Sequence, residues 1–419
     1  MLDIRLIREQ PDTVRENIRR RNMTVELDAL LAADQQALDL QKELERVRQR
    51  QNEIGKSMKG PMEAPARQAL VEEGRALKET EAGLAAQLAQ ADARRDELLR
   101  GVPNLTHPQA PNGVDDTQNR EVRRWGDIPQ LDFAPKDHLE LMESLDLIDF
   151  EGAARVTGQK FYYLKNEAVL LELALVTFAC NLLREEGFVL HITPDLARQE
   201  ILQGIGFNPR GDSAQIYNIE NTDLSLVATA EITLGGLLAG SVLEAEQLPL
   251  LYAGVSHCFR TEAGSHGRES KGLYRVHQFT KVEMFAFCPP EQSEALHEKI
   301  VSIEEKIYQQ LGIPYRVVDV CAGDLGAPAF RKYDLEAWMP GRGKWGEVTS
   351  ASNCTDYQAR RLDIRFKEPG KKGTRFAHML NGTAIAVSRT LIALIENGQQ
   401  ADGSIRLPAC LGLAPIRPK

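Results

Sequence analysis

Long apolar runs are missing from this chain of 419 residues. The longest, over about residues 168–180, is interrupted by Glu172 and is well short of the ~20 residues that a membrane-spanning helix needs. The first residues, MLDIRLIREQPDTVREN, carry charges throughout, unlike a secretion signal. We therefore expect a cytoplasmic protein with no membrane partner.

Paired cysteines are missing as well. The six cysteines are scattered, and none belongs to a CxxC pair; they are Cys180, Cys258, Cys288, Cys321, Cys354 and Cys410. Their spacings match no common zinc pattern, and the chain is far too long for a scaffold held together by disulfides. We expect reduced thiols and no zinc.

An excess of positive charge is also absent. The chain has 51 basic and 60 acidic residues, a formal net charge of −9, so it has no general attraction for nucleic acid. The phosphate-binding loops GxxxxGK[ST] and GxGxxG do not occur after any predicted strand. Binding of a nucleotide or of RNA would therefore depend on local groups of basic side chains.

Aromatic residues are lacking between about 27 and 100, where Glu, Gln, Arg, Ala and Leu dominate. Apolar residues recur there with a seven-residue period, interrupted at 59–65 by two prolines and a glycine. The repeating positions are Leu30, Ala37, Leu44, Gln51 and Met58 before the break, and Leu70, Leu77, Leu84, Ala91 and Leu98 after it. The pattern predicts an antiparallel coiled-coil hairpin over about 27–100, within an N-terminal helical domain of residues 1–100.

The hairpin by itself allows two interpretations. It could be a dimerisation or spacer element, or it could be a lever that contacts a distant partner. Residues 42–60 contain six basic and three acidic residues, so the far end of the first helix is locally basic inside an acidic protein. A patch of this kind is what contact with nucleic-acid phosphates requires.

We expect residues 101–419 to form a second domain of the α+β class. It begins with a linker over about 101–125, a stretch rich in proline, glycine and polar residues. Helical stretches at about 136–148, 166–187, 291–311 and 382–398 mix with short β-rich runs at 161–164, 250–258, 277–287 and 315–320. Strands and helices do not alternate regularly, so we expect a largely antiparallel sheet with helices packed against it.

One segment of this domain, residues 258–287, combines two apolar ends with a loop rich in Gly, Ser and Arg. Arg260 can bind a phosphate or carboxylate through its two-pronged guanidinium. Phe279 and Glu283 lie an even number of residues apart, so they share a face of the second strand. Phe279 can stack against a base, and Glu283 can hold an ammonium or a hydroxyl. The alternative is a solvated hairpin with scattered charges.

Several short motifs resemble those of the class II aminoacyl-tRNA synthetases. Residues 259–262, FRTE, resemble motif 2; residues 382–390, GTAIAVSRT, resemble motif 3; and residues 187–194 resemble motif 1. Residues 229–231, 347–350 and 352–361, together with the helical hairpin, narrow the resemblance to the bacterial-type seryl-tRNA synthetases, over nearly the whole chain.

The resemblance implies ATP and Mg²⁺ as cofactors. The implied catalytic residues are Arg260, Arg389 and Glu283. The implied ATP-binding residues are Arg260, Thr261, Glu262, Arg275, Val276, Phe279, Glu347, Val348, Thr349, Ser350 and Arg389. Among these, Glu347 and Ser350 would bind Mg²⁺ that bridges the phosphates, because their oxygens are hard ligands. Phe279 and Arg389 would enclose the adenine ring.

The resemblance further implies L-serine and serine tRNA as substrates, with selenocysteine tRNA as a further acceptor. The implied serine-binding residues are Thr229, Ala230, Glu231, Arg260, Glu283, Asn381 and Thr383, and the implied tRNA-binding residues are Arg46, Arg50, Lys56, Lys59 and Arg268. The serine carboxylate is already ionised near pH 7, so no general base is needed. Class II motif 1 implies a homodimer in which one subunit's arm serves tRNA bound to the other.

Three positions depart from the family pattern: Ala228 where proline is common, Ser388 where glycine is frequent, and Thr349 at a variable site. Two alternatives to tRNA charging are a paralogue that loads serine onto a carrier protein and a non-catalytic coiled-coil protein. The long arm argues against the first, since a carrier-protein ligase needs no such reach. The intact charged motif residues argue against the second.

Overall fold

The computed structural model describes residues 1–207, 216–263 and 271–418. The chain divides into two compact units, Met1–Pro103 and Asn104–Lys419. The described helices include none that is long and apolar enough to cross a membrane.

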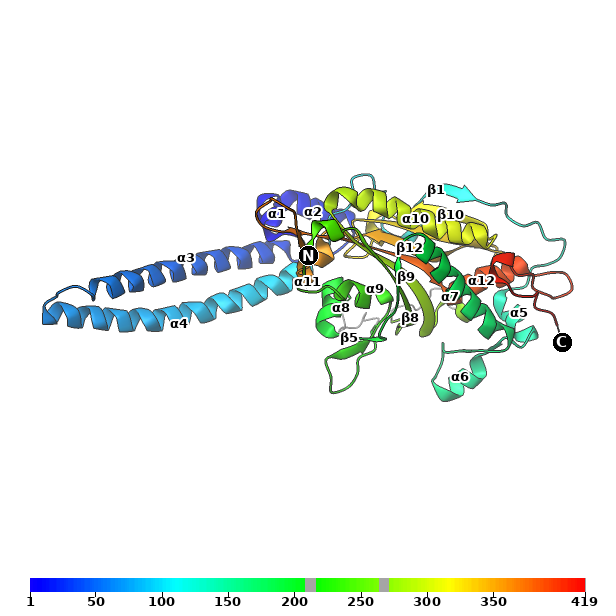
Figure 1. Ribbon diagram of the computed structural model, residues 1–419, viewed down its shortest axis with the longest axis horizontal. Helices are drawn as coiled ribbons and strands as arrows, with labels where there is room; N and C mark the ends of the chain where they lie inside the picture. The colour runs from blue at the N-terminus through cyan, green and yellow to red at the C-terminus, as the bar shows by residue number, and fades with distance from the viewer. Residues whose placement is uncertain (208–215, 264–270, 419) are drawn as a thin grey trace. The chain divides into compact units, whose positions relative to one another are not determined.

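The first unit is helical. It contains α1 (Ile4–Glu9), α2 (Pro11–Arg20), α3 (Leu27–Ser57) and α4 (Ala64–Arg100). Helices α3 and α4 run side by side as a hairpin (Figure 1), and their 31 and 37 residues correspond to about 46 and 55 Å at ~1.5 Å per residue. A proline in the first turn of α4 fits the helix start, where no backbone N–H is needed.

The buried side chains of this hairpin follow the heptad pattern. Leu30, Ala37 and Leu44 of α3 are buried, and so are Leu84 and Ala91 of α4. These are seam positions, so the coiled-coil hairpin predicted from the sequence is confirmed. At the end of α4 the buried residue is Leu99 rather than the predicted Leu98.

The second unit is built on an eight-stranded sheet with the strand order β1-β10-β11-β12-β15-β9-β8-β4. The strands are β1 (Arg120–Trp125), β4 (Val189–Ile192), β8 (Leu250–Phe259), β9 (Gln278–Cys288), β10 (Tyr315–Asp319), β11 (Arg331–Met339), β12 (Lys344–Asn353) and β15 (His378–Ala386). Every pairing in it is antiparallel except that of β4 with β8. The predicted α+β fold with a mainly antiparallel sheet is confirmed.

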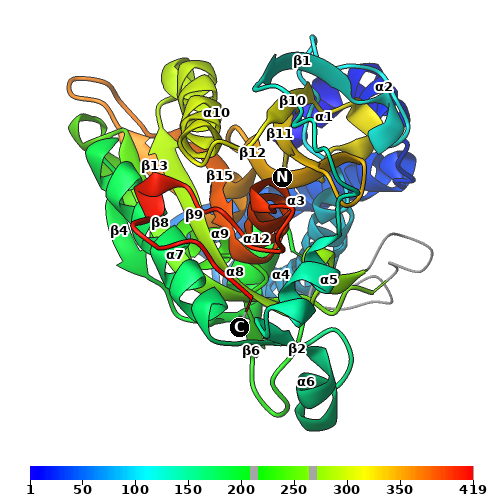
Figure 2. The same cartoon turned by 90° about the vertical axis from the view of Figure 1, so that its right-hand side faces the viewer.

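Helices cover the two faces of the sheet unequally. The long helices α7 (Glu167–Glu185), α10 (Ser293–Gln310) and α12 (Val387–Gly398) pack against one face (Figure 2) and form the larger apolar core with it. The short helices α8 (Gln199–Ile205), α9 (Ala230–Gly236) and α11 (Tyr357–Leu362) belong to a second core on the other face.

Strand β9 shows how one face of the sheet becomes a site. Met284 and Ala286 point into the larger core, whereas Phe285 and Phe287 point into the second one. Side chains alternate along a strand, so Glu283 lies on the same face as Phe285 and Phe287. The apolar part of this face is covered by short helices, and its polar part lines a cavity.

Smaller elements connect these layers. They are α5 (His138–Ser144), α6 (Phe150–Val156), β2 (Ile148–Asp149), β3 (Tyr163–Leu164), β5 (Leu196–Arg198), β6 (Leu224–Leu226), β7 (Val242–Glu244), β13 (Arg365–Lys367), β14 (Arg375–Phe376) and the 3₁₀ turns η1 (Asp116–Gln118), η2 (Ala245–Gln247), η3 (Gly272–Tyr274), η4 (Pro290–Gln292), η5 (Ala322–Asp324) and η6 (Ala409–Leu411).

Several predicted boundaries differ from the structure. The helical stretch predicted over about 136–148 is the shorter α5. Residues 120–125, which we expected to belong to a linker, form the edge strand β1, whose charged side chains are typical of an exposed sheet edge. The helix predicted over 382–398 begins only at Val387, because residues 382–386 belong to β15. Backbone pairing with β9 along this stretch, and with β12 at Gly382, outweighs local helix propensity there.

Candidate active site

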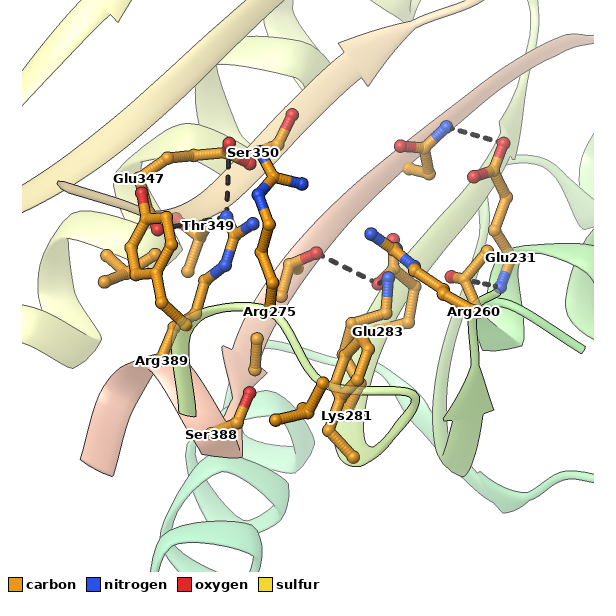
Figure 3. A pocket seen from close by; sticks show the side chains of 18 of the residues that line it. Glu231, Arg260, Arg275, Lys281, Glu283, Glu347, Thr349, Ser350, Ser388 and Arg389 are labelled. Carbon is orange, nitrogen blue, oxygen red and sulfur yellow. Dashed lines mark hydrogen bonds and ion pairs between the residues drawn. The ribbon is translucent and has the colours of Figure 1, made fainter. Parts of the chain in front are cut away.

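A cavity of about 240 Å³ opens over the polar part of the sheet, where elements from distant parts of the sequence meet. Figure 3 shows Glu347, Arg389 and Arg275 gathered at one end of it and Glu231 and Arg260 at the other. The predicted site residues that line it are Thr229, Glu231, Arg260, Glu262, Arg275, Val276, Phe279, Glu283, Glu347, Val348, Thr349, Ser350, Asn381, Thr383 and Arg389.

The remaining predicted residues lie elsewhere. Thr261 is not part of the cavity lining, and Ala230 is fully buried in the second core with its methyl group away from the cavity. The neighbours of Ala230, Thr229 and Glu231, take the two cavity-lining positions at the start of α9, and a role of Ala230 in binding serine stays a prediction. Arg268 lies outside the described residues.

The sequence interpretation missed several lining residues, namely Phe207, Tyr274, Lys281, Ser352, Ala386 and Ser388. Lys281 carries the clearest signal that was overlooked. It lies two residues from both Phe279 and Glu283, so strand alternation alone places it on the same face. Its ammonium lies 2.5 Å from the Glu283 carboxylate.

Two carboxylates, that of the buried Glu283 and that of the partly buried Glu231, define one end of the cavity. The Glu231 carboxylate accepts hydrogen bonds from the Gln358 amide at 2.8 Å and the Asn381 amide at 3.1 Å. Burial, reinforced by the nearby Glu283, raises the pKa of Glu231 to about 7. Glu283 is ion-paired with Lys281 and accepts a hydrogen bond from the Thr383 hydroxyl at 3.1 Å. This end can therefore hold a small ligand that carries an ammonium and a hydroxyl.

Local backbone chemistry holds this end in place. Thr229 is the N-cap of α9, and its hydroxyl accepts a hydrogen bond from the Glu231 backbone N–H at 3.1 Å. Asn381 and Thr383 lie on the cavity side of β15, and Thr383 is paired in register with Glu283 of β9. The sheet register, rather than proximity in the sequence, brings these polar groups together.

Arginine side chains define the opposite end. Arg389 contacts Glu347 twice, donating to its backbone oxygen at 3.1 Å and lying 3.1 Å from its carboxylate. Burial alone would raise the pKa of Glu347, but Arg389 and Lys332 outweigh it and hold that pKa at about 2. Glu347 is therefore ionised near pH 7, and Ser350 follows it along the same strand.

The residues expected to contact a base also lie along the cavity. The Arg260 guanidinium lies 5.3 Å from the centre of the Phe279 ring, and Arg389 lies 4.8 Å from the centre of the Tyr274 ring. Arg275 is ion-paired with Glu262 at 3.1 Å. Glu262 has a φ of +51°, a conformation that non-glycine residues seldom adopt and that is frequent at binding sites.

The predicted tRNA-binding residues of the first unit lie on the surface of the helical hairpin, outside the cavity. Arg46, Arg50, Lys56 and Lys59 are all exposed. Arg50, however, is ion-paired with Glu73 of α4 at 2.7 Å, so it links the two helices of the hairpin. Its charge is thereby partly neutralised by the hairpin itself.

Comparison with known proteins identifies both units. Residues 1–106 match the seryl-tRNA synthetase N-terminal domain, and residues 216–398 match the tRNA synthetase class II core domain (G, H, P, S and T). The chain is 54% identical to a serine–tRNA ligase of Treponema denticola, over 98% of both chains. It is 56% identical to that of Rubrobacter xylanophilus, over 98% of this chain and 97% of the relative.

Solved structures agree with these sequence matches. The crystal structure of seryl-tRNA synthetase from Pyrococcus horikoshii complexed with ATP superposes with a TM-score of 0.92, at 40% identity and over 100% of both chains. A prolyl-tRNA synthetase from Giardia lamblia, with 15% identity and a TM-score of 0.58, shares the fold over 66% of this chain. The resemblance inferred from the motifs is confirmed: the chain belongs to the seryl-tRNA synthetase family of class II aminoacyl-tRNA synthetases.

Proposed function

We propose that the protein activates L-serine with ATP and then transfers the seryl group to the 3′ end of serine tRNA. In the first step a serine carboxylate oxygen attacks the α-phosphorus of ATP, and pyrophosphate leaves. In the second step a hydroxyl of the terminal ribose attacks the seryl carbonyl, and AMP leaves. The observation that carries this proposal is one cavity with two carboxylates at one end and arginines at the other.

The carboxylate end suits serine. Glu231 would bind the ammonium, and Glu283 with Thr383, to which it is hydrogen-bonded, would bind the hydroxyl. Lys281 balances one of the two negative charges, so that the empty site need not bury two unpaired carboxylates. A site that buries hydroxyl partners rejects an amino acid without that group, because the partners are left unpaired.

The arginine end suits ATP. Arg260 lies at the carboxylate end beside the Phe279 ring, and from there its guanidinium can hold the α-phosphate and the serine carboxylate in line for attack. Phe279 and Arg389 would contact the adenine, with Glu262 and Val276 at its edge. Catalysis then consists of orientation and stabilisation of charge on the phosphate.

The residues present also fit Mg²⁺. Glu347 is anionic and Ser350 offers a hydroxyl, and such hard oxygen donors suit this ion. The described residues contain no group of three or more His, Cys, Asp or Glu that could hold a metal. Most ligands of the ion would therefore be phosphate oxygens of ATP, and the ion would neutralise charge on them.

The experiment that tests the function combines two assays. Serine-dependent exchange between pyrophosphate and ATP tests the first step, and charging of total tRNA with each of the twenty amino acids tests both. The proposal requires exchange with serine and a charged product with serine alone. Exchange without charging would show that the acceptor is not tRNA, and absence of both would refute the proposed chemistry.

We further propose that the helical hairpin binds the tRNA, from which we expect the two steps to be separable. Because Met1–Pro103 is a compact unit, deletion of residues 30–98 should leave exchange intact while charging collapses. Reversing the charges of Arg46, Lys56 and Lys59 keeps the heptad seam and should raise the KM for tRNA alone. Loss of exchange in a folded deletion variant would contradict this role.

A cytoplasmic homodimer completes the proposal. Apolar side chains are exposed on α7 and on the edge strand β4: Val169, Leu170, Leu173, Val189, Leu190 and Ile192. Ile192 is 90% exposed, and such side chains gathered at one sheet edge are typical of an interface. Light scattering should give the mass of two chains for the protein and of one chain for Ile192→Glu. The mass of one chain for the unchanged protein would refute the dimer.

A further inference from the structure

A buried histidine–glutamate pair lies outside the cavity, between α5 and α12. The side chains of His138 and Glu396 are 2% and 0% exposed. One Glu396 carboxylate oxygen lies 3.0 Å from the His138 backbone N–H and 3.0 Å from the His138 Nδ1. The other accepts a hydrogen bond from the Gly341 backbone N–H at 2.9 Å. Glu396 therefore joins α5, α12 and the turn between β11 and β12.

The histidine extends this network to a fourth segment. The backbone N–H of Leu273, in η3, points at the His138 Nε2 at 3.2 Å. A backbone N–H can only donate, so Nε2 must be the unprotonated, accepting nitrogen. The ring hydrogen is then on Nδ1, where it is donated to Glu396. The network thus assigns a neutral ring with one tautomer, which Glu396 selects.

The segment around η3 is built to accept the ring. Gly272 has a φ of +59°, and a Cβ added to it would lie 2.1 Å from the His138 Nε2. Only glycine fits a backbone this close to the ring. A second anchor comes from the preceding residues, since Lys271 is ion-paired with Asp137, the N-cap of α5. Two consecutive residues, 137 and 138, therefore hold residues 271–273.

The anchored segment leads directly into the ATP end of the cavity. Tyr274 is the last residue of η3, Arg275 and Val276 follow it directly, and all three line the cavity. The Tyr274 ring lies 4.0 Å from the Arg342 guanidinium and 4.8 Å from that of Arg389. Arg342 follows Gly341, which Glu396 holds. Glu396 therefore fixes both partners of the Tyr274–Arg342 contact.

We infer that His138 and Glu396 are positioning residues that set the place of residues 272–276 and thereby the affinity for ATP. This inference depends on the proposed function in one respect, namely that the cavity binds ATP. Neither residue lines the cavity, so neither takes part in the chemistry. Their contribution is a pre-formed nucleotide site, which lowers the cost of ordering that segment when ATP binds.

Two substitutions of His138 separate its two hydrogen bonds. In His138→Asn the side-chain amide replaces Nδ1 and can still donate to Glu396, but it ends short of Leu273. In His138→Gln the amide oxygen reaches the place of Nε2 and can accept from Leu273. We expect His138→Asn to raise the KM for ATP roughly 5- to 150-fold, the effect of one buried N–H left unpaired. The KM for serine should change less than about twofold, and His138→Gln should largely restore the KM for ATP.

His378→Asn is a matched control. His378 is a partly buried histidine at the start of β15 that is hydrogen-bonded to Ser293 and not to η3. The KM of the His378→Asn variant for ATP should therefore stay at the wild-type value. A second measurement, the rise in Tm that ATP alone produces, reads nucleotide binding without turnover. It should shrink in His138→Asn but not in His138→Gln or His378→Asn.

The outcomes distinguish this inference from the proposed function. If the unchanged protein shows no serine-dependent exchange, the proposed function fails, and the ATP-induced rise in Tm still tests the positioning. If exchange is present and His138→Asn keeps the wild-type KM for ATP, the inference is overturned. A parallel rise of both KM values in the two His138 variants would show a merely structural role and would overturn it as well.

Discussion

Glu231 is the group whose titration should be visible in serine activation. Its side chain is partly buried at the serine end of the cavity, and desolvation together with the nearby Glu283 raises its pKa to about 7. Only the ionised form can hold an ammonium. For an acid whose pKa is raised, the ionised fraction increases as pH rises through that value. We therefore expect kcat/KM for serine to rise between about pH 6 and pH 8, with its midpoint near 7.

The substitution Glu231→Gln keeps the shape and removes the charge. A hydrogen bond to a charged group contributes about 1.5–3 kcal/mol, so the variant should lose roughly 10- to 150-fold in kcat/KM for serine near pH 8. One unit below its pKa a carboxyl group is only about one-tenth ionised. The ratio of kcat/KM for serine between the unchanged protein and the variant should therefore shrink by about tenfold near pH 6. The variant's own profile should be flat across this range.

The assay is serine-dependent pyrophosphate exchange at several pH values, because kcat/KM reports the free enzyme's essential groups. Glu262→Gln is the matched control. It removes a carboxylate at the nucleotide end, where Glu262 is paired with Arg275, so it should alter the KM for ATP and keep the pH profile for serine. The reasoning is refuted if Glu231→Gln retains the wild-type pH profile.

Three further substitutions test other parts of the structure. Glu283→Ala should abolish selective activation of serine over alanine, because it removes the carboxylate bonded to Thr383; an unchanged serine-to-alanine ratio of kcat/KM would reassign the hydroxyl site. Arg260→Ala should slow adenylate formation by roughly 10²- to 10³-fold in single-turnover assays, whereas near-normal rates would remove it from the phosphate site. Glu304 is buried in α10 with no well-formed hydrogen bond to either oxygen, and burial raises its pKa well above the usual value. Its contribution to the free energy of unfolding therefore falls as pH rises above the pKa that Glu304 has in the unfolded chain. Glu304→Met should therefore be more stable near pH 8 by roughly 1–3 kcal/mol in urea denaturation, with a smaller gain near pH 5; equal stability at both would contradict this reading.

The hairpin could be predicted because the heptad pattern of a coiled coil depends only on residues close together in the sequence. The seven-residue period of Leu30, Ala37 and Leu44 places these side chains on one helical face whatever the rest of the chain does. The break at 59–65 then ends one helix and starts the next. Short motifs such as residues 259–262 were equally readable, and alternation along β9 placed Phe279 and Glu283 on one face.

Strand pairing and burial could not be predicted in this way, because they depend on residues far apart in the sequence. Residues 382–386 have no local feature that excludes a helix. They form a strand because β9 pairs with them, and β12 pairs with Gly382 on the other side. Residues 120–125 looked like a polar linker, and only pairing with β10 made them a strand. Ala230 illustrates the same limit, since a motif names three consecutive residues but the helix turns only two of them toward the cavity.

The helical arm, the class of sheet and most of the residue types in the cavity could be predicted from the amino-acid sequence, because each depends on the spacing of residues near one another in the chain. What those residues do together depends on the folded structure. Glu231 acquires a pKa near 7 only when Glu283 and the surrounding burial are brought to it, and His138 meets Glu396 across 258 positions of sequence. Electrostatic interactions and desolvation depend on distances in space, and those distances exist only once the sheet register and the packing of α12 are set.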